Sequence, residues 1–417
     1  MKNIEKQNTK PVTHGVAGSS PVRSAKGCLN GNLFHFMNAP QTLSFWERAT
    51  FFAPFDFVVI GSGIVGLNTA LTLREKNKKA RIAIVERGVL PSGGSTRNAG
   101  FACFGSVGEL LDDLKTHTET ELLNLIAFRY EGLLKLREKT GDKALHYEAR
   151  GGNEIFKTDE ADYHKECATA IPYFNALLEK NLNLSSVFSE QTAPKSFKNC
   201  LPLQIHNAAE GQINTGAMMQ ALLKKAQQKN IFLFNGLEIV HLETTVNGVK
   251  LHTRQGWHFE SQKVCVTTNA FTKSLLPDLN IEPARNQVLV TAPIKNLGFK
   301  GCFHYDKGYF YFRNIGNRVL IGGGRHLFRE QENTDQFGTT ENIRAVLENL
   351  LREVVLPHEK NIEITDAWSG ILGLGSEKKP ILKKINDRIF VGVRMGGMGV
   401  AIGSAVGEKL ATLSTEN

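Results

Sequence analysis

The sequence has few cysteines and no apolar run long enough to cross a membrane. Its six cysteines are scattered through 417 residues, with no C-x-x-C pair and no spacing typical of metal ligands. This pattern argues against a disulfide-reductase motif, a zinc site and a disulfide-stabilised secreted protein, so we expect no metal. No stretch approaches the roughly 20 apolar residues of a membrane-spanning helix. Without an apolar signal segment at the N-terminus, the sequence predicts a cytoplasmic protein with no membrane span.

Positive charge is in excess but is not concentrated. The formal net charge is +9, and the densest basic runs, at 76–79 and 378–379, are short. Such a distribution is typical of a solvated lysine-rich surface, so we do not expect a nucleic-acid partner. Residues 1–36 are polar and aperiodic, and we predict that they are disordered or foreign to the native protein, within an N-terminal extension over 1–51.

Periodic structure begins at residue 55. An apolar run over 55–60 is typical of a strand buried on both faces, helical spacing follows over 64–78, and a second short strand is expected over 81–86. A strand, a helix and a strand within about thirty residues predict a parallel sheet.

A G-x-G-x-x-G motif lies at the turn between this strand and this helix, which is the context that a dinucleotide site needs. The first glycine permits the tight turn, the second lets the backbone approach a pyrophosphate, and the third allows close packing of helix on strand. An acidic residue about 20 positions further on is placed to bind a ribose. The predicted contacts are Gly61, Gly63, Ile64, Val65, Gly66 and Glu86.

Two further glycine-rich segments favour FAD over NAD. A polar loop over 87–101 follows the acidic residue, and we expect it to run along the pyrophosphate towards a flavin. A second glycine-rich turn precedes the last predicted helix, whose N-terminal amides suit the charge of a reduced flavin. The predicted contacts are Arg87, Ser95, Thr96, Asn98, Ala99 and Gly100 in the loop, and Gly396, Gly397, Met398, Gly399 and Val400 in the turn.

Together these motifs resemble the D-amino-acid-oxidase-like FAD oxidoreductases, a family that includes glycine, sarcosine and gamma-glutamylputrescine oxidases. The resemblance runs from about residue 43 to the C-terminus. It implies further FAD contacts at Thr268 and Asn269, and an adenine contact through the backbone of Val240. Sarcosine oxidases attach flavin to a cysteine near the equivalent of 370–373; none occurs here, which implies non-covalent FAD.

The resemblance implies oxidation of a C–N bond in an amino acid or amine, by hydride transfer to the flavin. We predict that Arg313 binds a substrate carboxylate and that Tyr309 and Tyr311 shape the pocket, whereas we expect His304 and His326 to be structural. Relatives that oxidise simple amino acids carry an arginine just after the segment equivalent to 368–370. Its absence here favours an amine or a larger N-substituted substrate.

Several functions remain open at this point. An oxidase that passes electrons to oxygen is the preferred interpretation. Alternatives are a dehydrogenase with a quinone or protein acceptor, a flavoenzyme acting on a modified tRNA base, and a nucleotide-binding module without catalysis.

The expected fold is α/β, with a Rossmann-like FAD-binding domain on a parallel sheet and an interleaved substrate domain on a mainly antiparallel sheet. We assign 52–145, 205–280 and 360–417 to the FAD domain, and 146–204 and 281–359 to the substrate domain. Capping boxes at Ser106/Glu109 and Thr118/Glu121 predict two helix starts. Segments 257–260 and 263–267 are predicted as separate strands.

Overall fold

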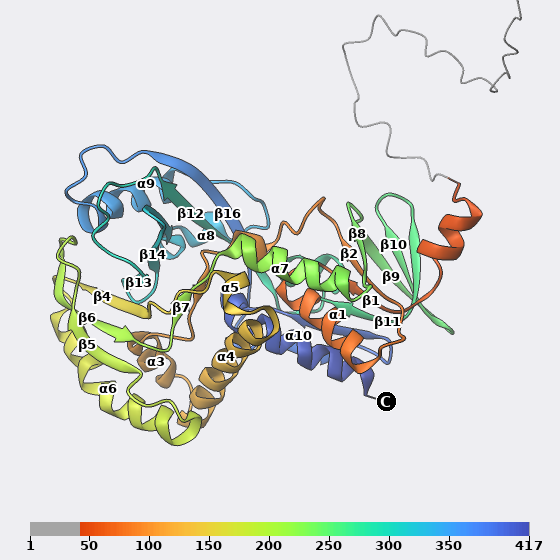
Figure 1. Ribbon diagram of the computed structural model, residues 1–417, viewed down its shortest axis with the longest axis horizontal. Coiled ribbons are helices and arrows are strands. Elements are labelled where there is room, and N and C mark those ends of the chain that lie inside the picture. The colour runs from red at the N-terminus through yellow and green to blue at the C-terminus, as the bar shows by residue number, and fades with distance from the viewer. Residues whose placement is uncertain (1–41, 417) are drawn as a thin grey trace, which may run out of the picture. The chain divides into compact units, whose positions relative to one another are not determined.

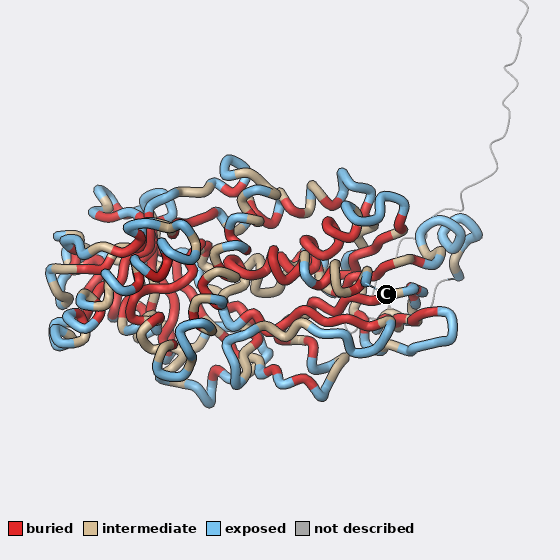
Figure 2. Tube along the Cα trace, turned by 90° about the horizontal axis from the view of Figure 1, so that it is seen from below, coloured by how far each residue is buried: buried red, intermediate tan, exposed pale blue. Residues whose placement is uncertain are grey.

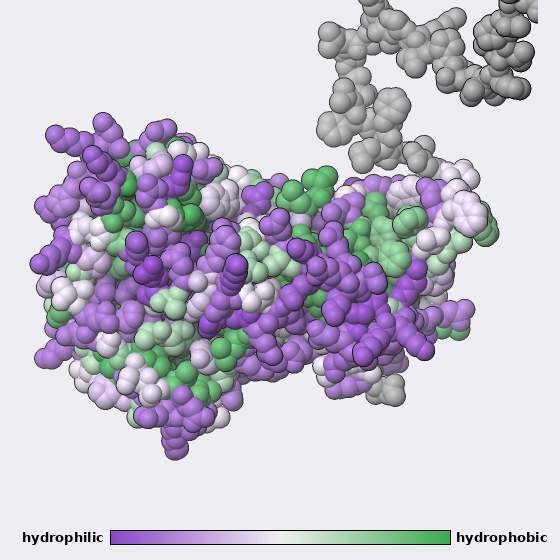
Figure 3. Space-filling view, viewed as in Figure 1, coloured by the Kyte–Doolittle hydropathy of each residue, from purple (hydrophilic) through white to green (hydrophobic). Residues whose placement is uncertain are grey.

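Two eight-stranded sheets organise residues 42–416, the part of the chain described by the structure, a computed structural model (Figure 1). The N-terminal residues 1–36, predicted to be disordered or foreign, lie outside this range. Within 42–416, no helix is long and apolar enough to cross a membrane. Hydrophilic side chains cover much of the face in Figure 3, with apolar patches scattered between them.

The first sheet contains the predicted strand–helix–strand unit. Its strands β18, β11, β1, β2 and β8 run parallel, and β17 pairs antiparallel at one edge. A meander of β9 and β10 continues from β11. The order is β17 (Ile381–Lys384), β18 (Ile389–Val393), β11 (His258–Val266), β1 (Phe55–Ile60), β2 (Ile82–Glu86) and β8 (Phe232–Asn235), with β10 (Gly248–Thr253) beside β11 and β9 (Ile239–Thr245) beside β10.

Strand β1 is buried on both faces, as the apolar run predicted. Phe57 and Val59 point into a core built with helices, whereas Val58 and Ile60 point into a second core shared with the β9–β10 meander. Successive side chains of a strand face opposite sides, so only a continuous apolar run satisfies both cores. Figure 2 shows buried segments running through the interior of the molecule, with exposed residues mostly at its periphery.

Helices α1 and α10 pack closely over the first sheet. Residues 64–73 of α1 are all buried. A side chain at Gly407 of α10 would place its Cβ 2.7 Å from the backbone oxygen of Val65, so the small residue permits the contact. The helices near this sheet are α1 (Ile64–Lys76), α2 (Gly94–Arg97), α4 (Glu119–Thr140), α5 (Asp142–Leu145), α7 (Thr215–Gln228) and α10 (Gly399–Thr415), with short helical turns at Glu47–Phe51 and Asn269–Ser274. Helix α3 (Val107–Leu114) lies on the side of the second sheet (Figure 1).

The second sheet is antiparallel except where β13 pairs parallel with β4. One face packs on α9 through aromatic residues such as Phe303 and Phe312. Its order is β16 (Ile364–Leu374), β12 (Glu282–Thr291), β15 (Arg318–Gly323), β14 (Phe310–Ile315), β13 (Cys302–Tyr305), β4 (Gly152–Lys157), β6 (Cys200–Asn207) and β5 (Phe188–Thr192). Helices α6 (Ala161–Leu182), α8 (Arg329–Glu332) and α9 (Glu341–Leu350) accompany it, with turns at Arg325–Phe328 and Leu351–Val355, and β3 (Phe101–Ala102) pairs separately with β7 (Gly211–Gln212).

The α/β class and both predicted capping boxes are confirmed. Two details differ from the sequence prediction. The segments 257–260 and 263–267 form a single strand, β11, because its first half pairs with β10 and its second half continues between β1 and β18. Strand β16, which we assigned to the FAD domain, pairs with β12 along most of its length and so belongs to the second sheet.

A buried ion pair ties α8 to this second sheet. Arg285 of β12 donates from Nε and Nη2 to the two carboxylate oxygens of Glu332, at 2.8 and 3.0 Å. Gln287 donates to the same carboxylate at 2.9 Å. The Glu332 side chain is fully buried, so its partners are the groups that compensate its lost hydration.

We expect Glu332→Ala to destabilise the protein by about 3–5 kcal/mol, because it leaves the buried Arg285 guanidinium without its partner. Urea unfolding followed by circular dichroism measures the loss. The control is Asp112→Ala, which breaks an exposed pair with Lys115 and should cost at most about 1 kcal/mol. Equal effects of the two substitutions would contradict this account.

Candidate active site

A cavity of about 370 Å³ runs from the carboxyl ends of β1 and β2 to the open face of the second sheet. Ile60 and Val85 line it at the first sheet, and Asn286 and Tyr311 line it at the second. The volume falls in the range of small-molecule and cofactor sites, and the place matches the general rule for parallel sheets, whose ligands bind beyond the carboxyl ends of the strands.

The glycine motif forms the tight turn at the start of this cavity. Gly61 has a φ of +101°, which favours glycine. A Cβ on Gly66 would lie 1.9 Å from the backbone oxygen of Gly61 and 2.7 Å from Thr267 Oγ1. Helix α1 therefore reaches the sheet only because residue 66 has no side chain, which brings its N-terminal amides to the cavity.

Glu86 ends β2 with its carboxylate at the cavity wall. Oε2 accepts hydrogen bonds from the backbone N–H and the hydroxyl of Ser62, at 3.0 and 2.8 Å, and Oε1 accepts from the N–H of Gly88 at 3.0 Å. These contacts fix the carboxylate beside the glycine turn. Each oxygen can accept more than one bond, so Glu86 retains capacity for ligand hydroxyls.

The polar side chains of the 87–101 loop mainly hold the loop itself. Ser95 Oγ accepts the N–H of Ile64 at 2.9 Å, and Thr96 donates to the carbonyls of Pro91 and Gly93. Asn98 donates to the carbonyl of Ser95 and accepts the N–H of Gly100. The loop is thus preorganised along the start of α1, where its backbone lines the cavity.

Asn269 joins the far end of the cavity to the C-terminal turn. Its Oδ1 accepts the N–H groups of Arg394 and Met395, both at 3.1 Å. This contact places the end of β18 beside the end of β11. The following turn contains two glycines with positive φ, Gly396 and Gly397, and leads into α10. A second helix N-terminus therefore faces the same cavity as α1.

Most of the predicted cofactor contacts meet at this cavity. Three of the predicted contacts do not line it. Gly66 and Thr96 lie behind the lining residues, and Val240 on β9 is 38% exposed, although its neighbour Ile239 lines the cavity. The predicted residues in the lining are Gly61, Gly63, Ile64, Val65, Glu86, Arg87, Ser95, Asn98, Ala99, Gly100, Thr268, Asn269, Gly396, Gly397, Met398, Gly399 and Val400.

Of the three predicted substrate residues, the structure places only Tyr311 in the cavity wall. Asn286 donates to its hydroxyl at 3.0 Å, and Phe101 packs edge-on against its ring. Arg313 is buried and donates to the carbonyls of Gly100 and Ile213, at 3.1 and 2.9 Å, so its position fits a structural anchor better than a carboxylate clamp. Tyr309 lies outside the cavity lining and is 46% exposed.

The charges around the cavity are unevenly placed. Its two arginines stack on aromatic rings: Arg87 on Phe271 and Arg97 on Phe337. Arg97 also donates to the carbonyls of Ser92 and Ser369. Beside β13 and β14, the capping-box residue Glu109 lines the wall, and within the described residues 42–416 the lining contains no lysine and no arginine besides Arg87 and Arg97.

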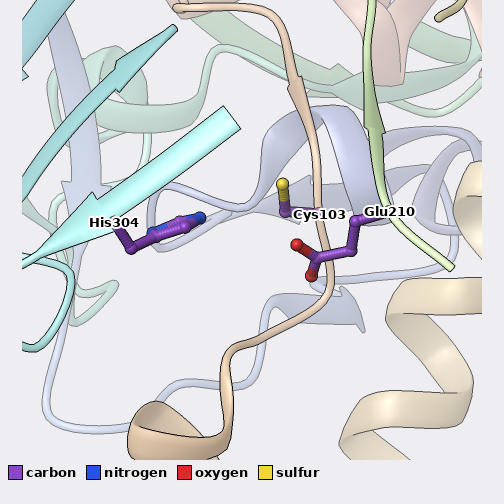
Figure 4. A group of neighbouring side chains, drawn as sticks. All are labelled: Cys103, Glu210 and His304. Carbon is purple, nitrogen blue, oxygen red and sulfur yellow. The ribbon is translucent and has the colours of Figure 1, made fainter. Parts of the chain in front are cut away.

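A cluster that the sequence analysis did not bring together lies at this same end. One ligand-type atom from each of Cys103, Glu210 and His304 falls within 4.8 Å of the others (Figure 4). Glu210 Oε1 accepts the N–H groups of Phe104 and Gly105, at 2.7 and 2.9 Å. The three residues come from distant segments, so no local spacing signalled them.

The cavity fits a dinucleotide on its geometry alone. Two helix N-termini line it, and a Cβ placed on Gly397 would meet open space. Backbone amides at both termini are therefore accessible to anionic phosphate or ring groups. Glu86 is placed to hold a ribose at the opposite end from the second sheet.

We expect Gly66→Ala to abolish cofactor retention, because the new Cβ would overlap the backbone oxygen of Gly61 and displace α1. The measurement is the ratio of the flavin band near 450 nm to protein absorbance after purification. Gly216→Ala, in the first turn of α7, is the control: its Cβ would meet Asn214 Oδ1 at 3.4 Å, an ordinary contact. An alanine at 66 with full flavin content would contradict the packing role of this residue.

Comparison with known proteins agrees with this geometry. Among curated proteins, the chain is 23% identical over 374 residues to glycine oxidase of Geobacillus kaustophilus, covering 86% of this chain and 92% of that one. It is 22% identical over 376 residues to the probable oxidoreductase OrdL of Haemophilus influenzae, covering 85% and 82%.

Solved structures share the fold. The crystal structure of the Geobacillus kaustophilus glycine oxidase matches with a TM-score of 0.69 at 20% identity, over 87% of this chain and 94% of that one. L-proline dehydrogenase from P. horikoshii matches with a TM-score of 0.68 at 17% identity, over 87% and 93%. The family described as DAO, FAD dependent oxidoreductase, matches residues 56–413. With nearly the whole chain matched, and with a cavity built for a dinucleotide, the protein belongs to the DAO family of FAD-dependent oxidoreductases.

Proposed function

We propose that this flavoenzyme oxidises the C–N bond of a cationic amine or N-substituted amine and returns its electrons to oxygen. The observation that carries the substrate class is the charge at the second-sheet end of the cavity. Glu109 lines that end, Arg87 is stacked on Phe271, and Arg97 is stacked on Phe337 and bonded to backbone carbonyls. A carboxylate attracts an ammonium group and repels a substrate carboxylate.

The lysines that follow the position of the missing carboxylate-binding arginine are engaged elsewhere. Lys378 pairs with Asp113, and Lys379 lies 3.8 Å from Glu121. Neither lines the cavity. Arg313, our sequence candidate for the clamp, lies outside the cavity lining, and its Nη1 donates to two backbone carbonyls. None of these three candidates is placed to bind the carboxylate of a simple α-amino acid, which supports an amine instead.

The chain's own contribution to the reaction is binding and orientation. When bound, FAD supplies the two-electron acceptor for the hydride. Glu109 holds the charged part of the substrate, while Tyr311 and Phe101 confine the carbon chain. Asn286 fixes the Tyr311 hydroxyl. Holding a carbon in a near-attack position is a large share of catalysis for such a reaction.

Assigning the substrate to the second-sheet end of the cavity gives the two sheets different roles. The first sheet and its helices form the FAD-binding part, with the predicted contacts from Gly61 to Val400 along the cavity. The second sheet, including β16, forms the substrate part. Oxygen as the acceptor is supported by relatives that are named oxidases, such as the glycine oxidase and the iminodiacetate oxidase from Chelativorans.

The first test is anaerobic mixing of the purified yellow protein with glycine derivatives, D-amino acids and polyamine conjugates. We expect the cationic amines to bleach the band near 450 nm faster than the simple amino acids, and the colour to return in air. Bleaching that air does not reverse would contradict an oxidase and indicate a dehydrogenase. A protein that no member of the panel bleaches would contradict amine oxidation.

The second test removes the charge of Glu109. The Glu109→Gln variant keeps the capping box, because glutamine serves at this position too. We expect the dissociation constant of a cationic amine, taken from the concentration dependence of anaerobic flavin reduction, to rise about tenfold, equivalent to about 1.4 kcal/mol.

The two capping boxes provide a matched control. Glu121 caps α4 in the same way as Glu109 caps α3, but it lies outside the cavity lining. Glu121→Gln should leave the dissociation constant unchanged. A neutral amine should also bind both variants equally. If Glu109→Gln binds the cationic amine as tightly as the wild type, the proposed basis of selectivity is incorrect.

A further inference from the structure

His304 separates the substrate end of the main cavity from a small interior pocket. The alternation of β13 buries Phe303 and Tyr305 in the core of the second sheet and turns His304 to the opposite face. There it lines both the main cavity and a pocket of about 10 Å³. The ring of Phe101 packs edge-on against it, with centroids 5.4 Å apart.

The substrate wall therefore contains an imidazole next to Tyr311. His304 and Tyr311 are paired residues on neighbouring strands, and Phe101 contacts both rings in the same edge-on manner. His304 Nε2 is buried and has no hydrogen-bond partner among the described residues. A buried ring nitrogen without a partner is costly, and His164 and His326 each have one too, but of the three histidines only His304 lines the cavity, where a ligand can supply the partner.

Glu210 lies behind this ring and is rigidly held. The N–H groups of Phe104 and Gly105 fix Oε1, and a Cβ on Gly152 would lie 1.9 Å from Oε2, so the carboxylate fills the space that glycine leaves. Burial raises the pKa of Glu210, whereas the nearby His304 lowers it. His304 is thus close enough to act electrostatically on the Glu210 carboxyl group.

Several other titratable groups face His304. Burial raises the pKa of Glu154, its register partner on β4, to about 7. Burial also raises the pKa of the Cys103 thiol and of Tyr311. Glu109 from α3 also lines this wall, and Cys302 from β13 lies next to Cys103.

We propose that His304 is a catalytic residue that accepts the proton of the substrate ammonium group, and that Glu210 is the positioning residue that stabilises the resulting imidazolium. This inference rests on the proposed function, because only a substrate whose reacting nitrogen arrives as an ammonium group needs such a proton acceptor. It also replaces our sequence expectation that His304 is structural.

The proton and electron balance is simple. An N–H bond of the substrate ammonium breaks, and an N–H bond forms on the imidazole, which leaves a neutral amine. The amine lone pair is then free to assist loss of hydride from the adjacent carbon, and both electrons leave with that hydride for the FAD. The imidazolium charge is opposed by the Glu210 carboxylate, and general-base transfer of this kind contributes 10²–10⁴-fold.

The test compares pH profiles of anaerobic flavin reduction for the wild type and the variants H304Q, E210Q and E154Q. The probe is the panel amine that bleaches the wild-type flavin fastest. We expect H304Q to lose about 100-fold in the limiting rate at pH 7, and to regain most of it at high pH, where the amine is neutral in solution. E210Q should lower the limiting rate with little change in the dissociation constant.

Two controls separate this role from structural damage. His326→Gln alters a histidine that stacks on Tyr309 and lies outside the cavity lining, so its profile should match the wild type. Flavin content and unfolding midpoint should be unchanged in H304Q. A loss of rate that is equal at all pH values would show a structural defect and overturn the proposal.

Two further results would also overturn it. The first is a limb of the pH–rate profile that persists in H304Q but disappears in E154Q, because Glu154 would then be the titrating group. The second is a loss of rate on dialysis against EDTA that added Zn²⁺ restores, because the Cys103–Glu210–His304 cluster would then be holding a metal. If an amine bleaches the wild-type flavin but H304Q has the same pH profile as the wild type, only the role of His304 fails. If no amine bleaches the wild type, the proposed function fails as well.

Discussion

The close contact between the start of α1 and the end of β1 sets the position of the nucleotide half of the site. Thr267 donates to the carbonyls of Ile60 and Gly61, and Gly66 packs directly over that turn. This contact brings β1, β11 and α1 together at one point. The α1 helix can then be buried along residues 64–73, which in turn gives α10 a surface to pack on. The absence of a side chain at Gly66 thus determines how far two helix N-termini project into the cavity.

The second sheet contributes to the site because the side chains of its strands alternate between two faces. Alternate residues of β13 and β14 supply either the aromatic core under α9 or the wall of the cavity. The wall is therefore as rigid as the core behind it. Phe101, from the separate β3–β7 pair, closes the space between Tyr311 and His304. The site is formed where two independently ordered surfaces meet, which suits a reaction that depends on holding two reactants in register.

Local patterns in the sequence predicted the parts that depend on local chemistry. The apolar run of β1, the glycine turn, the acidic end of β2 and both capping boxes follow from neighbouring residues, and the structure places them as expected. The split of β11 into two predicted strands was wrong, because pairing with β10 and then with β1 and β18 depends on distant partners.

The substrate end was harder to predict for the same reason. Alternation predicted that Arg313 and Tyr311 share one face of a strand. It could not predict how deep each side chain lies, because that depends on the approach of Gly100 and Ile213. Likewise Cys103, Glu210 and His304 come from three separate segments, and only the tertiary fold brings them together. Residue type alone did not mark His304, since a lone histidine in a strand is common in structural positions.

The order of the strands in the first sheet has a consequence for biosynthesis. Strand β18 and helix α10 complete this sheet, yet they follow every strand of the second sheet in the chain. While a ribosome is still making the second sheet, β11 lacks its β18 neighbour and α1 lacks its helical cover. The nascent chain therefore carries an apolar helix until α10 is made and an open parallel edge from the synthesis of β11 to that of β18, a state prone to misassociation. Folding of the nucleotide half must wait for the last helix, so chaperones that hold exposed apolar segments should matter more for this protein than its final stability suggests.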